Sequence, residues 1–271
     1  MAFTSYSDLL NKQTDATKTQ SLFAFKLNRS AGVAQGALGN AYRSAWKNDG
    51  TGGSGATPTT AATYDNTSAG CLPYALATGV NSLYLTGFMS SMASVNGAVV
   101  LYDRMAAIGG LVANVTTEQM TTGLAPARNT GGVGNKIFIE VYTSVGGTSS
   151  TLTVNYTNQA GTAGRISGAT RIGGTAFGVA SALIEVPLMD GDTGVQSVES
   201  VTLSATTGTA GNFGVTIMRE IFNAAAGVPV ITQAGFKGLA TIPAGACLML
   251  AYYNGSNITP DTFLNLQLTE A

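Results

Sequence analysis

The chain has 271 residues, no histidine, and charged side chains at only 10% of its positions. The missing histidine removes the side chain most used for proton transfer near neutral pH, and also the commonest metal ligand. With 13 basic and 14 acidic residues the net charge is −1, so no basic surface is available to attract a nucleic acid. We therefore expect a scaffold or binding protein rather than an enzyme. An apolar content of 45% suffices for a packed core.

Residues 1–20 are polar and lack the apolar core of a signal peptide. No apolar run approaches the roughly 18 residues that span a bilayer. We expect a protein without a membrane partner, one that stays in a cytoplasm or leaves it without a conventional signal peptide.

Residues 1–82 predict an N-terminal arm that is extended and partly helical. Residues 7–20 predict a short helix with Ser7 as its N-cap, and the charge of Asp8 in the first turn favours the helix dipole. Residues 22–27 predict a short strand.

Residues 49–70 consist mainly of Gly, Thr, Ala and Ser, with almost no bulky side chain. Such a segment does not bury enough apolar area to order itself, so it is a mobile loop or an arm ordered against a neighbouring subunit. We favour the arm, because Trp46 and residues 71–74 provide anchors at its two ends.

The two cysteines, Cys71 and Cys247, form neither a zinc-binding pattern nor a disulfide framework. Cys247 opens the apolar run 247–253, which favours a small buried side chain. A disulfide with Cys71 is the alternative.

From residue 83 onward, short runs of alternating apolar and polar residues recur between glycine-rich turns. Leu152, Val154 and Tyr156, for example, alternate with Thr and Asn as in a half-buried strand. Residues 101–111 and 116–123 could hold short helices. The strands predicted in this way are 83–88, 99–102, 137–142, 151–156, 182–186, 200–204, 213–218, 248–253 and 264–268.

Strands without long intervening helices predict a mainly β fold: an antiparallel β-sandwich of jelly-roll or Greek-key type over residues 83–271. Residues 137–142 and 248–253 are apolar on both faces of the expected strand. They are therefore central strands covered on each side, or strands with one face turned to a partner. The second possibility favours a homo-oligomer, and we expect a trimer.

Asp190 and Asp192, separated by a glycine, are the most compact acidic cluster. They could begin a calcium loop, but the twelfth position of such a loop is Val201 instead of the required Glu. We favour a turn in which the Asp side chains bond local backbone amides. No metal-binding residue is assigned.

Residues 131–136 are glycine-rich and end in Lys136, as in a phosphate loop. A phosphate loop needs Gly-Lys-Ser/Thr between a strand and a helix, whereas here Asn135 precedes the lysine and a strand follows. We expect a hinge or the start of a hairpin, and we assign no cofactor.

Catalysis by paired carboxylates is the enzyme chemistry that the composition still allows. Nothing in the sequence pairs the available residues, so we assign no catalytic residue and expect no enzyme activity. The candidates are Glu118, Glu140, Glu185, Glu199 and Glu220.

Two adjacent pairs of opposite charge, Asp103-Arg104 and Arg219-Glu220, are expected to be solvated or intersubunit charges. Six tyrosines either form a contact surface or lie at the edge of the core, and the sequence favours neither interpretation. They are Tyr84, Tyr102, Tyr142, Tyr156, Tyr252 and Tyr253.

Two segments rich in Thr, Gly and Ala, Thr151 to Gly161 and Val195 to Thr216, resemble β-rich virion proteins of tailed bacteriophages, particularly those that decorate or cement the head. The resemblance covers under a fifth of the chain. It implies assembly in the host cytoplasm on a capsid lattice, with the major capsid protein and copies of the chain itself as partners. Similar strands occur in tail tube and fibre proteins.

These observations predict a non-enzymatic virion structural protein that decorates or cements a phage capsid through protein–protein contacts, without a cofactor. The alternative is a glycan-binding receptor or adhesion module, with a site of Tyr, Asn and Asp on loops and a host glycan as ligand. A tail or fibre protein is a further alternative.

Overall fold

The computed structural model describes residues 2–26, 38–40, 57–75, 82–92, 97–226, 239–254 and 262–271. The described residues form two short helices, α1 (Tyr6–Thr14) and α2 (Gly174–Phe177), and otherwise strands, turns and loops. The strands are β1 (Thr19–Lys26), β2 (Leu38–Asn40), β3 (Ala62–Thr63), β4 (Leu83–Met92), β5 (Gly97–Leu111), β6 (Gln119–Leu124), β7 (Asn135–Thr143), β8 (Ser150–Asn158), β9 (Arg165–Ile166), β10 (Thr170–Ile172), β11 (Ala182–Val186), β12 (Val195–Leu203), β13 (Asn212–Ala226), β14 (Ala240–Ile242), β15 (Leu248–Asn254) and β16 (Thr262–Glu270).

The strands form three sheets, and every pairing between the described strands is antiparallel. Sheet A has the order β1-β16-β4-β14, and sheet C has the order β10-β8-β12-β6, with β9 added beside β8. Sheet B has the order β13-β7-β11-β2-β15-β5-β3. The predicted fold class, a mainly β antiparallel sandwich, is confirmed.

Sheet B closes on itself, because β13 pairs with β5 as well as with β7. The six strands β13-β7-β11-β2-β15-β5 therefore form a ring, which we call the central ring. Alternate side chains along each strand point to opposite faces of a sheet. One face of the central ring thus points into its interior, and the other points outward to sheet A or sheet C.

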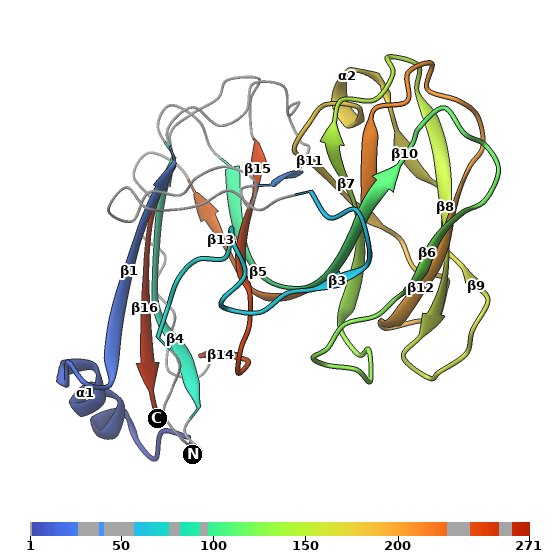
Figure 1. Ribbon diagram of the computed structural model, residues 1–271. Coiled ribbons are helices and arrows are strands. Elements are labelled where there is room, and N and C mark those ends of the chain that lie inside the picture. Colours follow the sequence, from blue (N-terminus) through green and yellow to red (C-terminus); the bar gives the residue numbers. More distant parts are fainter. Residues whose placement is uncertain are drawn as a thin grey trace.

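Two lobes share this ring (Figure 1). The insert lobe packs sheet C against β7, β11 and the adjoining halves of β5 and β13, and its core residues all fall between Met105 and Ile217. The terminal lobe packs sheet A against β15 and the other halves of β5 and β13, and its core draws on residues from Leu22 to Leu268. The strands β5 and β13 have 15 residues each and run through both lobes.

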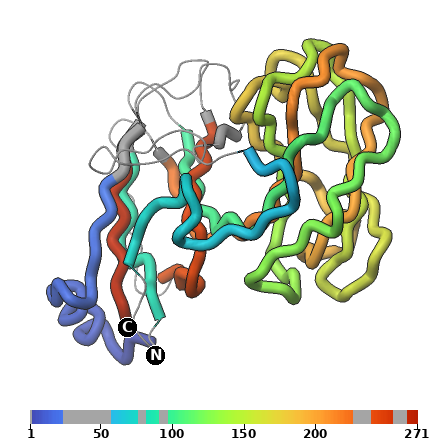
Figure 2. Tube along the Cα trace, viewed as in Figure 1, coloured from blue at the N-terminus to red at the C-terminus, as the bar shows by residue number. Residues whose placement is uncertain are grey.

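The terminal lobe brings the two ends of the chain together (Figure 2). Strand β1 lies beside β16, in a register that pairs Thr19 with Thr269. The N-terminal region thus contributes both α1 and a strand of sheet A. Helix α1 begins after Ser5 rather than Ser7, because the Ser5 hydroxyl accepts a hydrogen bond from the Asp8 N–H at 3.1 Å.

The helices expected at 101–111 and 116–123 are wrong, since these residues lie in β5 and β6. Every residue of β5 from Val99 to Gly109 is buried. A strand covered on both faces loses the alternation that marks a half-buried strand, and its continuous apolar run resembles a buried helix.

Residues 57–70 pack against other parts of the same chain. For this part of segment 49–70, the expected arm against a neighbouring subunit is therefore corrected. Strand β3 pairs with β5, the Tyr64 N–H donates to the Met105 carbonyl at 3.0 Å, and the Asn66 N–H donates to the Gly245 carbonyl at 3.1 Å. Backbone hydrogen bonds therefore order a segment that has few apolar side chains. Trp46 and residues 49–56 lie outside the described residues.

Residues 137–142 and 248–252 are buried on both faces within the single chain, whereas Tyr253 is 38% exposed. On the inward face of the central ring, Phe138 and Met249 are 0% and 1% exposed, and Tyr64 and Cys71 pack against the cluster that contains them. The inward face therefore needs no partner to cover it. An apolar strand face turned to a partner therefore no longer supports the expected trimer, which stays a prediction.

Candidate functional site

A buried ion pair lies inside the central ring. Arg104 Nη1 lies 2.7 Å from Glu140 Oε2, and the two side chains are 1% and 0% exposed. The same carboxylate oxygen accepts hydrogen bonds from Thr216 at 2.8 Å and Tyr142 at 3.1 Å. Burial raises the pKa of Tyr142, so its hydroxyl stays protonated and donates. The Arg104 guanidinium also lies over the Tyr64 ring, 4.8 Å from its centre.

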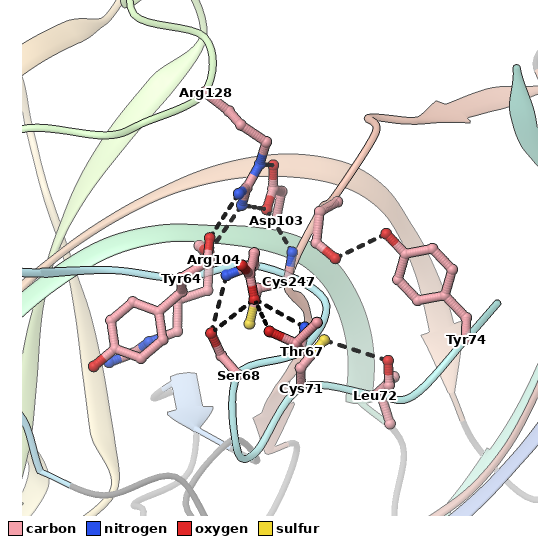
Figure 3. A network of polar contacts seen from close by, with 12 residues as sticks. Tyr64, Thr67, Ser68, Cys71, Leu72, Tyr74, Asp103, Arg104, Arg128 and Cys247 are labelled. Atoms are coloured by element: carbon pink, nitrogen blue, oxygen red, sulfur yellow. Dashed lines mark hydrogen bonds and ion pairs between the residues drawn. The ribbon is translucent and has the colours of Figure 1, made fainter. Parts of the chain in front are cut away.

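A second ion pair fixes the segment that leads from β3 to β4 (Figure 3). Arg128 makes two hydrogen bonds to the Asp103 carboxylate, at 3.2 and 2.6 Å, and donates to the Tyr64 carbonyl at 2.6 Å. Asp103 also accepts from the Cys247 N–H at 3.0 Å. Burial raises the pKa of Asp103, although Arg128 acts in the opposite direction.

These contacts correct the expectation that Asp103 and Arg104 are solvated or intersubunit charges. Both are buried, because β5 is covered on each face where it passes between the lobes. The other adjacent pair differs: Arg219 is exposed, and Glu220 is half-buried at the surface.

A polar groove of about 390 Å³ lies at one end of the central ring, lined by residues 134–136 and 185–193. Lys136 extends between Glu185 at 3.0 Å and Glu220 at 3.7 Å. Desolvation acts to lower the pKa of Lys136, but Glu185 and Glu220 outweigh it and the pKa rises. Lys136 is therefore a fully charged cation that two carboxylates share.

Residues 131–134 form the turn that precedes β7, and Asn135 and Lys136 are the first residues of the strand. The Asn135 N–H donates to the Gly132 carbonyl at 2.9 Å, and Gly132 has a φ of +80°, which favours glycine. The strand begins directly at Asn135. The expected turn into a strand, rather than a phosphate loop, is confirmed.

Asp192 belongs to a network that ties the turn before β12 to β8 and β9. Its carboxylate accepts from Tyr156 at 2.5 Å, from Asn158 at 2.7 Å, and from two Arg165 nitrogens at 2.9 and 3.2 Å. Arg165 and Tyr156 lower the pKa of Asp192 to about 2. We expected bonds to local backbone amides, so the partners are a correction. Asp190, two residues earlier, is exposed.

The structure brings two of the five candidate glutamates together, Glu185 and Glu220, around Lys136. Glu118 accepts from Ser200 at 2.5 Å, and Glu199 accepts from Ser197 at 2.6 Å and Thr157 at 2.9 Å. The grouping of Glu185 with Glu220 spans three strands, and no local spacing in the sequence signals it. Among the described residues, no group of three or more His, Cys, Asp or Glu is arranged to hold a metal ion.

Most of the six tyrosines lie in the core. Tyr102, Tyr142, Tyr156 and Tyr252 are at most 6% exposed, whereas Tyr253 is 38% exposed. Cys247 is fully buried, as expected for a small apolar side chain, and both thiols are free. No helix in the described part of the chain combines the length and apolar character needed to cross a membrane.

No family model matches the chain, and no curated protein matches it. Among solved structures, the VP2 subviral particle of infectious bursal disease virus is 12% identical, with 94% of this chain and 82% of that chain covered and a TM-score of 0.23. The T13 particle of the same virus is 11% identical, with 95% and 79% covered and a TM-score of 0.20. A family 11 carbohydrate-binding module of Clostridium thermocellum is 12% identical, with 60% and 95% covered and a TM-score of 0.20. The chain is thus distantly similar to viral particle proteins and to a carbohydrate-binding module, and these likenesses carry no argument about its function.

Proposed function

We propose that this protein is a non-enzymatic structural protein of a virion. The observation that carries the proposal is the continuity of β5 and β13, which pair with each other through both lobes. Two sandwiches that share the same strands move as one rigid body, because any hinge between them would break the hydrogen bonds of this ladder. A rigid body suits a protein whose task is to hold neighbours in place.

The charged groups support this proposal because several of them form ion pairs inside the fold. Arg104 with Glu140, Arg128 with Asp103, and Arg165 with Asp192 join strands and turns that are distant in sequence. Buried or partly buried pairs of this kind fix a single arrangement of the elements they join. These ion pairs give structural roles to charged residues of the types that also act in catalysis.

The outward face of sheet C supports contacts with other proteins. The half-buried side chains of β8 on this face are hydroxyls and an amide: Thr151, Thr153, Asn155 and Thr157. A net charge of −1 gives little repulsion between copies. Such a surface suits close packing in a lattice of neutral neighbours.

The finer proposal is decoration or cementing of a phage head, with the major capsid protein and copies of the chain as partners, a trimer, and assembly in the host cytoplasm. Its support is the resemblance of residues 151–161 and 195–216 to such proteins. The strands β8 and β12 within these segments pair with each other in sheet C. The outward face of sheet C is therefore the surface we propose for the capsid contact.

The proposal is tested on virus particles from the source of the sequence, purified by density gradient. We expect the protein in the particle band at many copies per particle, counted against isotope-labelled peptides. Immunogold microscopy then separates head from tail. Absence from the particles, with the protein left in the soluble fraction, would overturn the proposal. Light scattering of the purified protein tests the trimer separately.

Glycan binding is the second candidate, and the polar groove at the end of the central ring favours it. Lys136, Glu185 and Asp190 line this groove, and their side chains match the hydroxyl groups of a sugar. A glycan array with the wild-type protein and the Asp190→Ala variant tests it. The matched control is Asp8→Ala, which removes a partly exposed carboxylate of α1 that does not line the groove. Binding that Asp190→Ala abolishes and Asp8→Ala retains would favour this candidate.

A further inference from the structure

The two cysteines, 176 positions apart in the chain, meet at the edge of the central ring. The Leu72 N–H donates to the Leu248 carbonyl at 2.9 Å, and each cysteine directly precedes one end of this hydrogen bond. Leu72 and Leu248 both point into the core of the terminal lobe. Cys247 points the opposite way, into the cluster of the ring interior, and Cys71 packs against both that cluster and the core of the terminal lobe.

The two sulfur atoms lie in the same region of the structure (Figure 3). Cys71 packs against the apolar cluster of the ring interior, which contains Cys247. The contact between the thiols also acts electrostatically: a hydrogen bond that Cys247 donates to Cys71, together with burial, raises the pKa of Cys247.

The backbones of both cysteines are held in place. The Cys247 N–H donates to Asp103, and the Cys247 carbonyl accepts from the Arg104 N–H at 2.9 Å. The Cys71 N–H donates to the Ser68 carbonyl at 3.1 Å. Thiols that lie close together on fixed backbones favour a disulfide formed by side-chain rotation, without movement of the chain.

We propose that Cys71 and Cys247 form an intramolecular disulfide under oxidising conditions, and that this bond fastens residues 57–75 to β15. The oxidant we name is a small-molecule disulfide such as glutathione disulfide. The half-buried Cys71 thiolate attacks it, forming a mixed disulfide and releasing one small thiol. Cys247 then attacks the Cys71 sulfur and releases the second small thiol. One S–S bond is broken and one is formed, and the two protein protons pass to the two released thiolates.

The order of the two steps follows from exposure. Cys71 is partly exposed, whereas Cys247 is fully buried. The second step is slow near neutral pH, because burial keeps Cys247 protonated. The inference does not depend on the proposed virion function.

The bond would fasten a segment that spans both lobes. Residues 57–75 contact the insert lobe through the Tyr64 carbonyl, which accepts from Arg128, and the terminal lobe through the Tyr74 hydroxyl, which donates to the Ala246 carbonyl at 2.9 Å. A disulfide at Cys71 would keep this segment in place when the surrounding hydrogen bonds open.

The test uses the full-length protein, purified with both thiols reduced and then incubated with glutathione disulfide at mildly alkaline pH. We expect an intact mass lower by two hydrogen atoms, loss of both titratable thiols, and a peptide map that joins Cys71 to Cys247. The thermal unfolding midpoint should rise, and a reductant should reverse the rise.

The Cys71→Ser variant is the matched control, because the half-buried site tolerates a hydroxyl. It should keep the reduced protein's unfolding midpoint and show no rise with oxidant. Three results would overturn the inference: two thiols that stay free, a stable glutathione adduct on Cys71 alone, or a disulfide between two chains on a non-reducing gel. The mass and the gel assign each sample to one of these results or to the expected one.

Discussion

The two lobes bury similar cores but are assembled from the chain in different ways. The insert lobe takes all its core residues from one continuous stretch, Met105 to Ile217. The terminal lobe joins residues near both ends of the chain, since β1 pairs with β16 and β16 pairs with β4. The insert lobe can therefore form most of its contacts locally, whereas the terminal lobe must first bring together segments about 250 positions apart.

This difference would ordinarily mark two independent domains, one inserted into the other. Here β5 and β13 both continue across the boundary, where their pairing shifts register between Ile217 and Met218 but does not end. The interior of the central ring also contains residues from both sides, such as Phe138 and Met249. We therefore expect the lobes to unfold together despite their different assembly.

The largest effect is expected from breaking the ion pair inside the central ring. The Glu140→Leu variant leaves the buried Arg104 without its carboxylate, and removing one partner of a buried pair costs about 3–5 kcal/mol. Urea unfolding, followed by circular dichroism, measures this change. Both lobes should lose stability together, because Arg104 lies on β5 and Glu140 on β7.

The double variant Arg104→Met with Glu140→Leu is the control for that experiment. It removes both charges and fills the space with apolar groups, so most of the lost stability should return. A double variant as unstable as Glu140→Leu would show that shape, rather than the uncompensated charge, is responsible.

The second-largest loss of stability is expected from shortening one buried leucine in either core, which compares the two cores directly. Leu268→Ala in the terminal lobe and Leu152→Ala in the insert lobe each remove a buried leucine from a strand, at a cost of about 2–5 kcal/mol. If the lobes are one cooperative unit, each variant shifts a single calorimetric transition. Two transitions, of which each variant moves only one, would contradict the shared-strand argument.

Strands with one face turned to water were the part better predicted from the sequence. Leu152, Val154 and Tyr156 alternate with half-buried polar residues because β8 has one such face, and the strand was correctly expected. β5 has no such alternation, and its second half was expected to be helical. The pairing of Thr19 with Thr269 left no local signal, since register between distant strands depends on the whole sheet.

The candidate sites follow the same rule. The turn before β7 was predicted because glycine preferences are local. The partners of Asp192, Glu140 and Asp103 come from other strands, and nothing near these residues in the sequence identifies them. The sequence therefore predicted which groups are present, but not which of them meet.

A smaller effect, arising from a group in the insert lobe, should appear in acid. Arg165 and Tyr156 depress the pKa of Asp192 to about 2 in the folded protein, below the value of about 3.9 in an unfolded chain. The stabilisation is complete above the unfolded pKa and is lost as the pH falls toward 2. Unfolding midpoints between about pH 6 and pH 2 should therefore fall less steeply for Asp192→Asn than for the wild type. Asp190→Asn, which removes an exposed carboxylate from the same turn, should follow the wild-type curve.

The smallest effect is expected at the surface, where Lys136 lies between Glu185 and Glu220. These side chains are 37%, 41% and 32% exposed, so water and salt screen their attraction. The Lys136→Met variant keeps the length of the side chain and removes the charge, and it should lower stability by less than about 1 kcal/mol. The loss should shrink further in high salt, whereas the loss from Glu140→Leu should barely change, because the interior pair is shielded from ions. Urea unfolding of both variants at low and high salt measures the contrast. A Lys136→Met loss as large as that of Glu140→Leu would mean that the end of the central ring, and not its interior, holds the two lobes together.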